Sequence, residues 1–301
     1  ENKKDLKVII SDSNIPGEGE HKLLKHLKEN KDLENEKINV IYGLDADLIM
    51  LCISSKLNNI LLLRETVEFD NTIHANGYKF LYLQIDKLKE NLITEILLRM
   101  DRKYMTPEER VKILDDYIFF SFLLGNDFIP HSPAINIRTN GIDYIMDAYA
   151  NTLGSENKTI VENNEKINWK HFRQFMEYLK NNEHAYIKHE YSMRNKRKRS
   201  YKTTTLEDIQ YKFLNLPTID RSVEEYINPN EDKWQERYYK ALFDIEITEP
   251  LRKKICINFL EALEWTFKYY TIGCCDWRWK YNYDYPPLLE DLYKYIPYFD
   301  N

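Results

Sequence analysis

Strand-like and helix-like segments alternate through the first part of the chain, and this alternation constrains the fold more than any other feature. Apolar runs of strand length cover residues 7–10, 38–44 and 60–64. Helical spacing follows the first run at residues 20–30 and the second at residues 48–54. Because strands that alternate with helices pair in parallel, we expect an α/β fold whose mostly parallel sheet is flanked by helices.

After the third strand-like run the pattern turns helical. Thr106 is placed to cap a helix, Pro107 suits its first position, and Glu109 completes a capping box. This helix should run to about Leu124, because Gly125 fits a helix end.

The chain divides near residue 150 into two expected regions. Residues 1–150 carry the α/β pattern, whereas residues 151–301 are predicted to be mainly helical, with a polar and basic insertion and an end rich in tryptophan and tyrosine. Helices are expected near residues 170–192, 233–243 and 250–270. The basic run at residues 194–199 fits a solvated loop, a contact to nucleic-acid phosphates or a nuclear-localisation signal.

Composition excludes some classes of protein. No run of 18 apolar residues and no apolar leader occurs, so we expect neither a membrane span nor a signal peptide, and an intracellular address. The four cysteines show no Cys-x-x-Cys spacing, which argues against a disulfide framework and a structural zinc site. The net charge of −6 argues against a nucleic-acid partner. However, a site that collects carboxylates for metal ions is acidic by construction and can lie beside a basic groove.

Five carboxylates stand at positions where they can meet. Glu18 and Glu20 lie in a glycine-flanked loop at an expected helix start, so both could face one point. Asp45 and Asp47 follow a predicted strand, at the end of a parallel sheet where ligands bind. Asp127 follows the long apolar helix. Five acids in one place would repel one another without cations, and two Mg²⁺ or Mn²⁺ ions suit both oxygen ligands and phosphodiester cleavage.

Each acid also has a structural explanation. Glu18 and Glu20 could offset the dipole in the first turn of a helix. Asp45 and Asp47 could form a turn and an N-cap, and Asp127 could be a turn residue. The two pairs occur at the same end of neighbouring β-α units, which favours the metal-site interpretation.

Around these acids the sequence closely resembles the Xrn family of 5′→3′ exoribonucleases. The matching motifs are SDSNIPGEGEHK at residues 11–22, YGLDADLIML at residues 42–51, LRE at residues 63–65 and GNDFIPH at residues 125–131. The likeness resumes in an aromatic segment with Trp265, Tyr269, Tyr270, Gly273, Trp277, Trp279, Tyr281, Tyr285 and Pro287.

The resemblance implies a core of the 5′-nuclease or PIN-like type that removes mononucleotides from single-stranded RNA with a 5′ monophosphate. By that likeness the catalytic metal ligands for two Mg²⁺ or Mn²⁺ ions are Glu18, Glu20, Asp45, Asp47 and Asp127. Flap nucleases that act on DNA continue after the corresponding Gly-x-Asp motif with a glycine-rich helix-hairpin. Residues 128–133 lack it, which favours RNA as the substrate.

Five further residues are candidates for contacts with RNA. Trp277 and Trp279 could stack on unpaired bases or belong to the core. Lys22 and Arg64 could approach phosphate or pair with the acidic ligands. His131 follows the family pattern, but the sequence does not define its role.

The chain also departs from the family. Its first residue is Glu1 and an apolar run follows almost at once, as expected of an excised piece. Xrn enzymes carry further metal-binding aspartates and a basic pocket for the 5′ phosphate in a preceding region. We therefore expect a missing N-terminal segment of the same protein as a partner. Asp284 stands where the family usually has histidine, which puts local substrate contacts in question.

Two functions of different classes follow from these observations. The first is a metal-dependent exoribonuclease, expected in the cytoplasm, with the nucleus as the alternative address. The second is a catalytically inactive RNA-binding or scaffold module derived from the same family. Retention of five mutually repelling acids favours the enzyme.

Overall fold

The computed structural model describes residues 7–34, 36–65, 79–163, 166–196, 204–214 and 220–297. The first elements are α1 (Gly19–Glu29), α2 (Lys31–Glu34), β1 (Asn39–Tyr42), α3 (Asp47–Ser54), β2 (Ile60–Glu65), β3 (Phe80–Gln84), α5 (Ile85–Arg99) and α6 (Pro107–Ser121). The 3-10 turn η1 (Phe122–Leu124), α7 (Gly141–Tyr149), the π-helix η2 (Ala150–Gly154), β4 (Val161–Glu162), β5 (Lys166–Ile167) and α8 (Trp169–Lys196) follow. The last elements are α9 (Leu206–Leu214), α11 (Ser222–Ile227), α12 (Trp234–Phe243), α13 (Glu249–Thr271) and α14 (Leu289–Tyr295).

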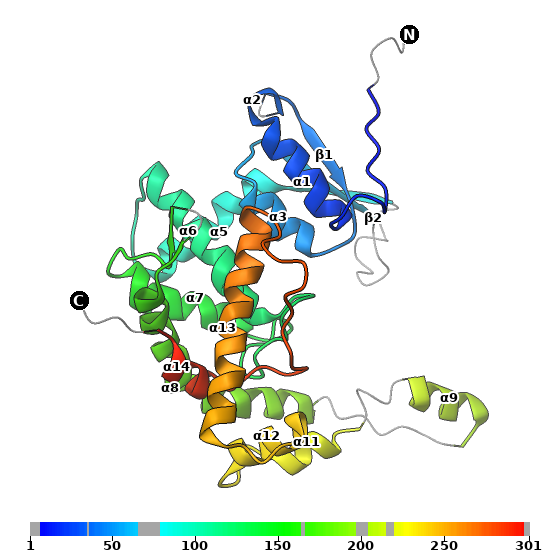
Figure 1. The fold of residues 1–301 in the computed structure, drawn as a ribbon, viewed down its shortest axis with the longest axis vertical. Helices are drawn as coiled ribbons and strands as arrows, with labels where there is room; N and C mark the ends of the chain where they lie inside the picture. Colours follow the sequence, from blue (N-terminus) through cyan, green and yellow to red (C-terminus); the bar gives the residue numbers. More distant parts are fainter. Residues whose placement is uncertain are drawn as a thin grey trace.

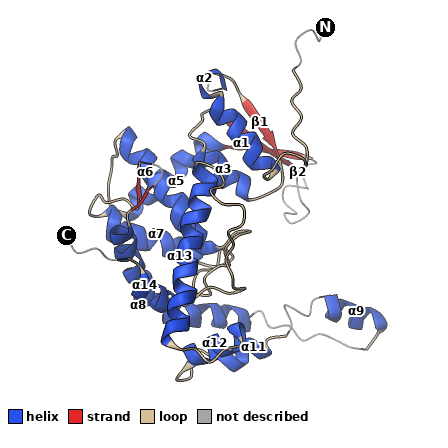
Figure 2. Cartoon of the chain, viewed as in Figure 1, coloured by secondary structure: helices blue, strands red, loops and turns tan. Residues whose placement is uncertain are grey.

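Helices dominate the molecule, and the larger sheet lies at one end of it (Figures 1 and 2). β1 pairs in parallel with β2, whereas β3 pairs antiparallel with β2. The predictions of an α/β region and of a helical C-terminal region are confirmed. Among the described strands, however, the sheet is small and mixed, because β3 runs antiparallel to β2. The strand β3 was not predicted from the sequence.

Residues 7–10 do not form the predicted buried strand. Val8 is 68% exposed and Ile10 is 81% exposed, and no described strand pairs with this segment. An apolar run becomes a strand only where another strand satisfies its backbone N–H and C=O groups. The prediction identified the composition of a strand but could not identify a partner for it.

The two faces of the sheet differ in burial. Ile41 and Leu62 are 3% and 0% exposed, and α3 and α5 pack against β2. On the opposite face the register aligns Tyr42, Leu63 and Tyr82 in one row. Tyr42 is 57% exposed and Tyr82 is 60% exposed, so this face is uncovered by the described residues.

The start of α6 follows the prediction, whereas the α-helix ends at Ser121 and the predicted stretch to Leu124 continues as the 3-10 turn η1. The Thr106 hydroxyl accepts the backbone N–H of Glu109 at 3.2 Å, and the Glu109 carboxylate accepts that of Thr106 at 2.8 Å. After η1 the chain turns at Gly125, whose φ is +86°. A Cβ atom at this position would lie 2.8 Å from the backbone nitrogen of His131. Glycine therefore permits the close turn that leads into Asp127.

α13 joins the sheet end of the molecule to the helical end (Figure 1). It contacts α3, α6 and α14, and Phe267 in its last turns packs edge-on against Phe119 of α6 at 5.6 Å. One contiguous hydrophobic core therefore extends from the sheet into the helices. The division of the chain at residue 150 stays a prediction. Within the described ranges, no helix has the length and apolar character needed to span a membrane.

Candidate metal centre

The structure brings the five predicted acids into one electrostatic neighbourhood. Glu18 precedes the first residue of α1 and Glu20 lies in its first turn. Asp45 lies between β1 and α3, and Asp47 begins α3. Asp127 follows η1. Glu18 is repelled by Glu20, Asp127 and Asp47, and Asp47 is repelled by Asp45, Asp127 and Glu20.

This repulsion adds to the effect of burial on two of the acids. Burial is the main cause that raises the pKa of Glu18 and the pKa of Asp47 above their ordinary values. A tyrosine hydroxyl bonded to each carboxylate lowers the pKa, and the neighbouring acids raise it again. The net result disfavours the charged form of both side chains.

The structural explanations of these acids account for only part of the arrangement. The Asp45 carboxylate accepts the backbone N–H of Asp47 at 3.1 Å, so one of its oxygens helps α3 to begin. Glu18 precedes α1 but makes no capping bond with its side chain. The turn after η1 is held by Asn126, whose side-chain oxygen accepts two backbone N–H groups, and not by Asp127.

Two tyrosines that the sequence did not single out for a role contact the acids directly. Tyr269 donates to Glu18 Oε2 at 3.1 Å, and Tyr270 donates to Asp47 Oδ2 at 2.7 Å. Both lie in the last turn of α13, so the helical region reaches into the acidic centre. The only sequence signal for this role was their place in the aromatic segment that resembles the Xrn family.

His21 lies against the same tyrosines. Its ring stacks on Tyr269 with centroids 3.9 Å apart and meets Tyr270 edge-on at 5.3 Å. Burial, followed by the charge of Lys28, lowers the pKa of His21 to about 4. The ring is therefore neutral near pH 7, and its 3.5 Å approach to Glu18 is a contact without a salt bridge.

The two tryptophans proposed to contact RNA differ in exposure. Trp277 is 61% exposed, and Tyr269 meets its ring edge-on at 6.2 Å. Trp279 is partly buried and stacks on Trp265 with centroids 5.4 Å apart. Trp277 therefore offers an open aromatic face near the acids, whereas Trp279 packs against the core.

Lys22 and Arg64 donate to backbone carbonyls. Lys22 Nζ donates to the carbonyls of Asp12 and Ile15, both at 3.0 Å, and Arg64 donates to that of Leu44. These bonds hold the loops that carry Glu18 and Asp45, and among the described residues neither positive charge has a carboxylate partner. A contact with phosphate stays a prediction for both residues.

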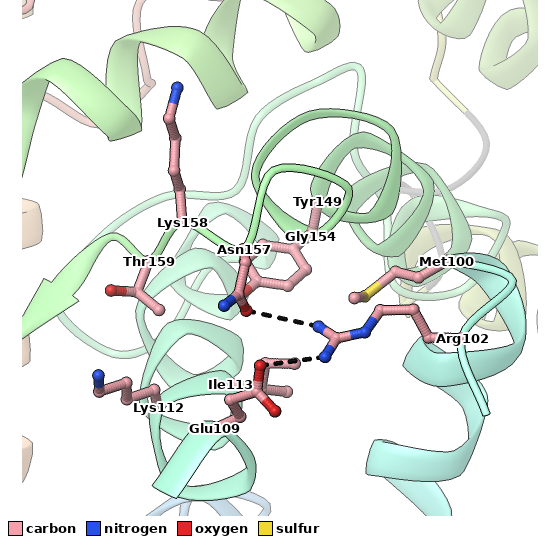
Figure 3. Close-up of a pocket in the computed structure, with 10 residues that line it drawn as sticks. All are labelled: Met100, Arg102, Glu109, Lys112, Ile113, Tyr149, Gly154, Asn157, Lys158 and Thr159. Atoms are coloured by element: carbon pink, nitrogen blue, oxygen red, sulfur yellow. Dashed lines mark hydrogen bonds and ion pairs between the residues drawn. The ribbon is translucent and has the colours of Figure 1, made fainter. Parts of the chain in front are cut away.

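Cavities occur beside the acids and away from them. One of about 570 Å³ lies between α1 and the end of α13, and its lining includes Lys25, Lys28 and Trp277. Another, of about 380 Å³, is lined by His131 and the C-terminal half of α8. Figure 3 shows a third, of about 80 Å³, where Arg102 lies between Glu109 and Asn157. None of the predicted site residues lines this third cavity.

The donor atoms fit a hard divalent cation, because all five predicted ligands are carboxylates. In the described part of the chain, however, no three acidic, histidine or cysteine side chains lie close enough to hold one ion together. The residues present thus offer the donor chemistry of a Mg²⁺ or Mn²⁺ site without a closed ligand shell.

Comparison with known families shows which family the chain belongs to. The profile described as "XRN 5'-3' exonuclease N-terminus" matches residues 1–66, and the "Xrn1 helical domain" matches residues 108–218 and 215–297. The chain belongs to the Xrn family. The predicted resemblance is therefore confirmed. The first matched region holds four of the acids, and the second holds Asp127 and both tyrosines, so both Xrn regions contribute to the centre.

Individual relatives agree with this assignment. The chain is 25% identical to 5′-3′ exoribonuclease 2 of Arabidopsis thaliana over 96% of its length and 40% of the relative's. It is 26% identical to 5′-3′ exoribonuclease 1 of Homo sapiens over 95% of its length and 19% of the relative's. A shorter match, 36% identical over 50% of the chain, is to 5′-3′ exoribonuclease 2 of Yarrowia lipolytica and covers 15% of that relative. The chain thus spans 40% or less of the length of these relatives.

Proposed function

We propose that this chain forms part of a metal-dependent 5′→3′ exoribonuclease that degrades 5′-monophosphorylated single-stranded RNA to mononucleotides. The observation that carries the proposal is the electrostatic neighbourhood that Glu18, Glu20, Asp45, Asp47 and Asp127 share in a chain of the Xrn family. Membership of the family supports the reaction and the RNA substrate. The all-carboxylate donor set supports Mg²⁺ or Mn²⁺, with two ions as the usual number for phosphodiester cleavage.

The residues divide into those that hold cations and those that meet RNA. Divalent cations would lower the pKa of a water nucleophile and stabilise the charge that develops on the phosphate and the leaving oxygen. The five carboxylates would hold these cations, and Tyr269 and Tyr270 already bond to two of them. The exposed ring of Trp277 would accept an unpaired base, a contact worth about 1–3 kcal/mol.

The uncovered face of the sheet supports a larger core. Tyr42, Leu63 and Tyr82 form an apolar row without a covering layer among the described residues, and Val8 and Ile10 are also exposed. Exposed apolar patches of this kind mark surfaces that other polypeptide covers. We propose that a further segment of the same protein packs here and completes a core of the 5′-nuclease or PIN-like type.

One observation favours the inactive scaffold, because no three acidic, histidine or cysteine side chains of the described residues lie close enough to hold one ion. The mutual repulsion of the acids opposes it. Acids that repel one another destabilise a fold unless cations offset the repulsion, so a module without metal would benefit from losing them. The cytoplasmic address, with the nucleus as its alternative, stays a prediction.

The test is degradation of a single-stranded RNA labelled at its 3′ end, by the longest natural form of the protein. The RNA carries a 5′ monophosphate or a 5′ triphosphate, and Mg²⁺ or a chelator is present. We expect loss of the monophosphate substrate only, and only with the metal. As a control, Asp143→Asn changes an exposed acid that pairs with Arg99 outside the centre and should leave the activity unchanged.

The opposite outcome is equally clear. If the folded full-length protein binds the RNA but leaves it intact with Mg²⁺ and with Mn²⁺, the scaffold hypothesis replaces the enzyme hypothesis. Equal degradation of the triphosphate substrate would instead contradict the proposed 5′-end specificity.

A further inference from the structure

The end of α13 lies between α1 and α3, the two helices that begin beside the acids. Tyr269 and Tyr270 are consecutive, and consecutive residues point about 100° apart around a helix. Tyr269 therefore reaches Glu18 before α1, while Tyr270 reaches Asp47 at the start of α3. One helix end thus contacts acids from two separate sequence motifs.

The same helix end is bonded to the far ends of α1 and α3. Lys28, near the end of α1, donates to the carbonyls of Tyr270 and Thr271, each at 3.2 Å. Ser54, the last residue of α3, donates to the carbonyl of Tyr270 at 3.2 Å. The C-terminal ends of α1 and α3 therefore bond to the backbone of α13. Acids at the N-terminal ends of the same two helices bond to the tyrosine hydroxyls of α13.

Aromatic packing fixes the two tyrosine rings. Tyr269 is 5% exposed and stacks on Trp265 at 5.1 Å, with His21 against it at 3.9 Å. Tyr270 is 2% exposed and meets Phe122 edge-on at 5.2 Å. The hydroxyl groups are consequently held in place by the core and do not depend on the acids for their position.

The third acidic segment packs against the same cluster. Phe128, the residue after Asp127, meets the ring of Tyr269 edge-on at 5.2 Å and that of Trp265 at 5.2 Å. The Tyr269 ring therefore touches the Asp127 turn while its hydroxyl bonds to Glu18. All three acidic segments therefore contact residues in the last turn of α13.

We propose that Tyr269 and Tyr270 are positioning residues that hold Glu18 and Asp47 in the orientation that binds the metal ions. Each hydroxyl donates to a single oxygen, Glu18 Oε2 or Asp47 Oδ2, and leaves the other oxygen of the carboxylate for a cation. Outer hydrogen bonds of this kind orient metal ligands, and their loss typically weakens metal affinity 10- to 100-fold. This inference rests on the proposed function of the acidic centre.

The two hydroxyls should differ in effect. The Tyr270 bond is 2.7 Å long and that of Tyr269 is 3.1 Å. Glu18 also has its His21 contact and a more exposed carboxylate, whereas Asp47 begins a helix against which Tyr270 is buried. We therefore expect Tyr270→Phe to weaken metal binding more than Tyr269→Phe.

The test is calorimetric titration of the longest natural form with Mn²⁺ alone. We expect the dissociation constant to rise by about 10- to 100-fold in Tyr270→Phe and by a smaller factor in Tyr269→Phe. The matched control is Tyr238→Phe, which removes a buried hydroxyl that donates to the Pro286 carbonyl at 2.9 Å and makes no hydrogen bond to the five acids of the centre. Mn²⁺ affinity should be unchanged in this control.

Kinetics and a double substitution separate positioning from general structural damage. At limiting Mn²⁺, Tyr270→Phe should lower kcat and leave the KM for RNA unchanged, with recovery at saturating Mn²⁺. Because Tyr270 acts through Asp47, it should have no further effect on Mn²⁺ affinity in an Asp47→Asn background. An additive effect there, or an equal loss of affinity in Tyr238→Phe, would overturn the positioning role.

Failure of the inference and failure of the proposed function give different results. If the unaltered protein binds no Mn²⁺ and degrades no RNA, the metal centre itself is refuted. If it binds Mn²⁺ and Tyr270→Phe binds it equally well, only the positioning role of the tyrosines is refuted.

Discussion

Two groups of acids in this molecule meet opposite surroundings. Glu18 and Asp47 lie among other carboxylates, and each is bonded to one tyrosine hydroxyl. Asp116 and Glu183 lie inside the helical region, 0% and 4% exposed, and backbone N–H groups donate to both of them. We propose that the first group receives positive charge from outside, whereas the second is satisfied by hydrogen bonds within the fold.

Asp116 shows how complete the second arrangement is. Its carboxylate accepts the backbone N–H of Ile160 at 2.9 Å, that of Val161 at 2.7 Å and the hydroxyl of Tyr149 at 2.9 Å. It thereby joins α6 to the end of α7 and to the strand β4. An acid with such partners needs no cation, so burial alone does not distinguish a functional carboxylate from a structural one. The hydrogen-bond donors around the carboxylate make this distinction.

The largest expected effect comes from Asp47→Asn. This change removes one charge from the acidic centre and keeps an acceptor for Tyr270, so RNA degradation should fall by about 10³-fold or more while the fold persists. The melting temperature should stay level or rise, because repulsion among the acids is reduced. Single-turnover degradation and thermal melting check the two parts. Tight Mn²⁺ binding retained in this variant would contradict the ligand assignment.

The reverse pattern is expected for Asp116→Ala. Two backbone N–H groups and the Tyr149 hydroxyl would lose their acceptor inside the core, which should lower the free energy of unfolding by roughly 2–4 kcal/mol. Urea unfolding measures this loss, with the exposed Asp143→Ala as a control that changes it by about 1 kcal/mol at most. Activity per folded molecule should be unchanged, and a selective loss of Mn²⁺ binding would break the comparison.

The pH dependence of stability offers a third test. Burial raises the pKa of Glu183 to about 8, although the N–H groups of Glu290 and Leu289 oppose the shift. The folded state therefore binds a proton that the unfolded state releases near pH 4.5. This contribution to stability is complete below about pH 4.5 and is lost as the pH rises through about 8. Urea unfolding at pH 5 and pH 8 should show a smaller difference for Glu183→Gln, and an equal difference would refute the assignment.

The smallest expected effect is that of Tyr149→Phe. It removes the one side-chain donor to Asp116 among the described residues, and backbone donors remain, so the free energy of unfolding should fall by about 1 kcal/mol. Mn²⁺ affinity should not change. The same chemical substitution at Tyr270 is expected to do the opposite, and urea unfolding and Mn²⁺ titration of both variants would sharpen the contrast. Similar changes in stability and in Mn²⁺ affinity at the two positions would contradict the difference between the two groups of acids.

The parts of the centre that sequence could predict are local. The helix start at Thr106 and the end of the helical stretch at Gly125 follow from residues a few positions apart, and both are confirmed. The pair Asp45 and Asp47 was placed between a strand and a helix, and the structure has Asp45 there and Asp47 as the first residue of α3. Such features depend on hydrogen bonds within one turn of the backbone, so neighbouring residues in the sequence are enough to predict them.

The parts that sequence could not predict depend on distant partners. Tyr269 lies 251 positions from Glu18, and Tyr270 lies 223 positions from Asp47. Adjacent tyrosines on an apolar helix are indistinguishable from core residues until the helix is placed. Likewise, residues 7–10 have the composition of a strand, and only the tertiary structure shows that the described chain provides no partner for it.

α13 also has a mechanical consequence. Its 23 residues make a stiff rod of roughly 34 Å. Glu249 and Arg252 in its first turn contact Tyr295 and Asp291 of α14, and its last turn carries the two tyrosines beside the acids. A helix resists compression along its axis, so a tilt imposed at the α14 end is transmitted to the far end. We therefore expect that a displacement of α14 would change the spacing of the carboxylates at the other end of α13.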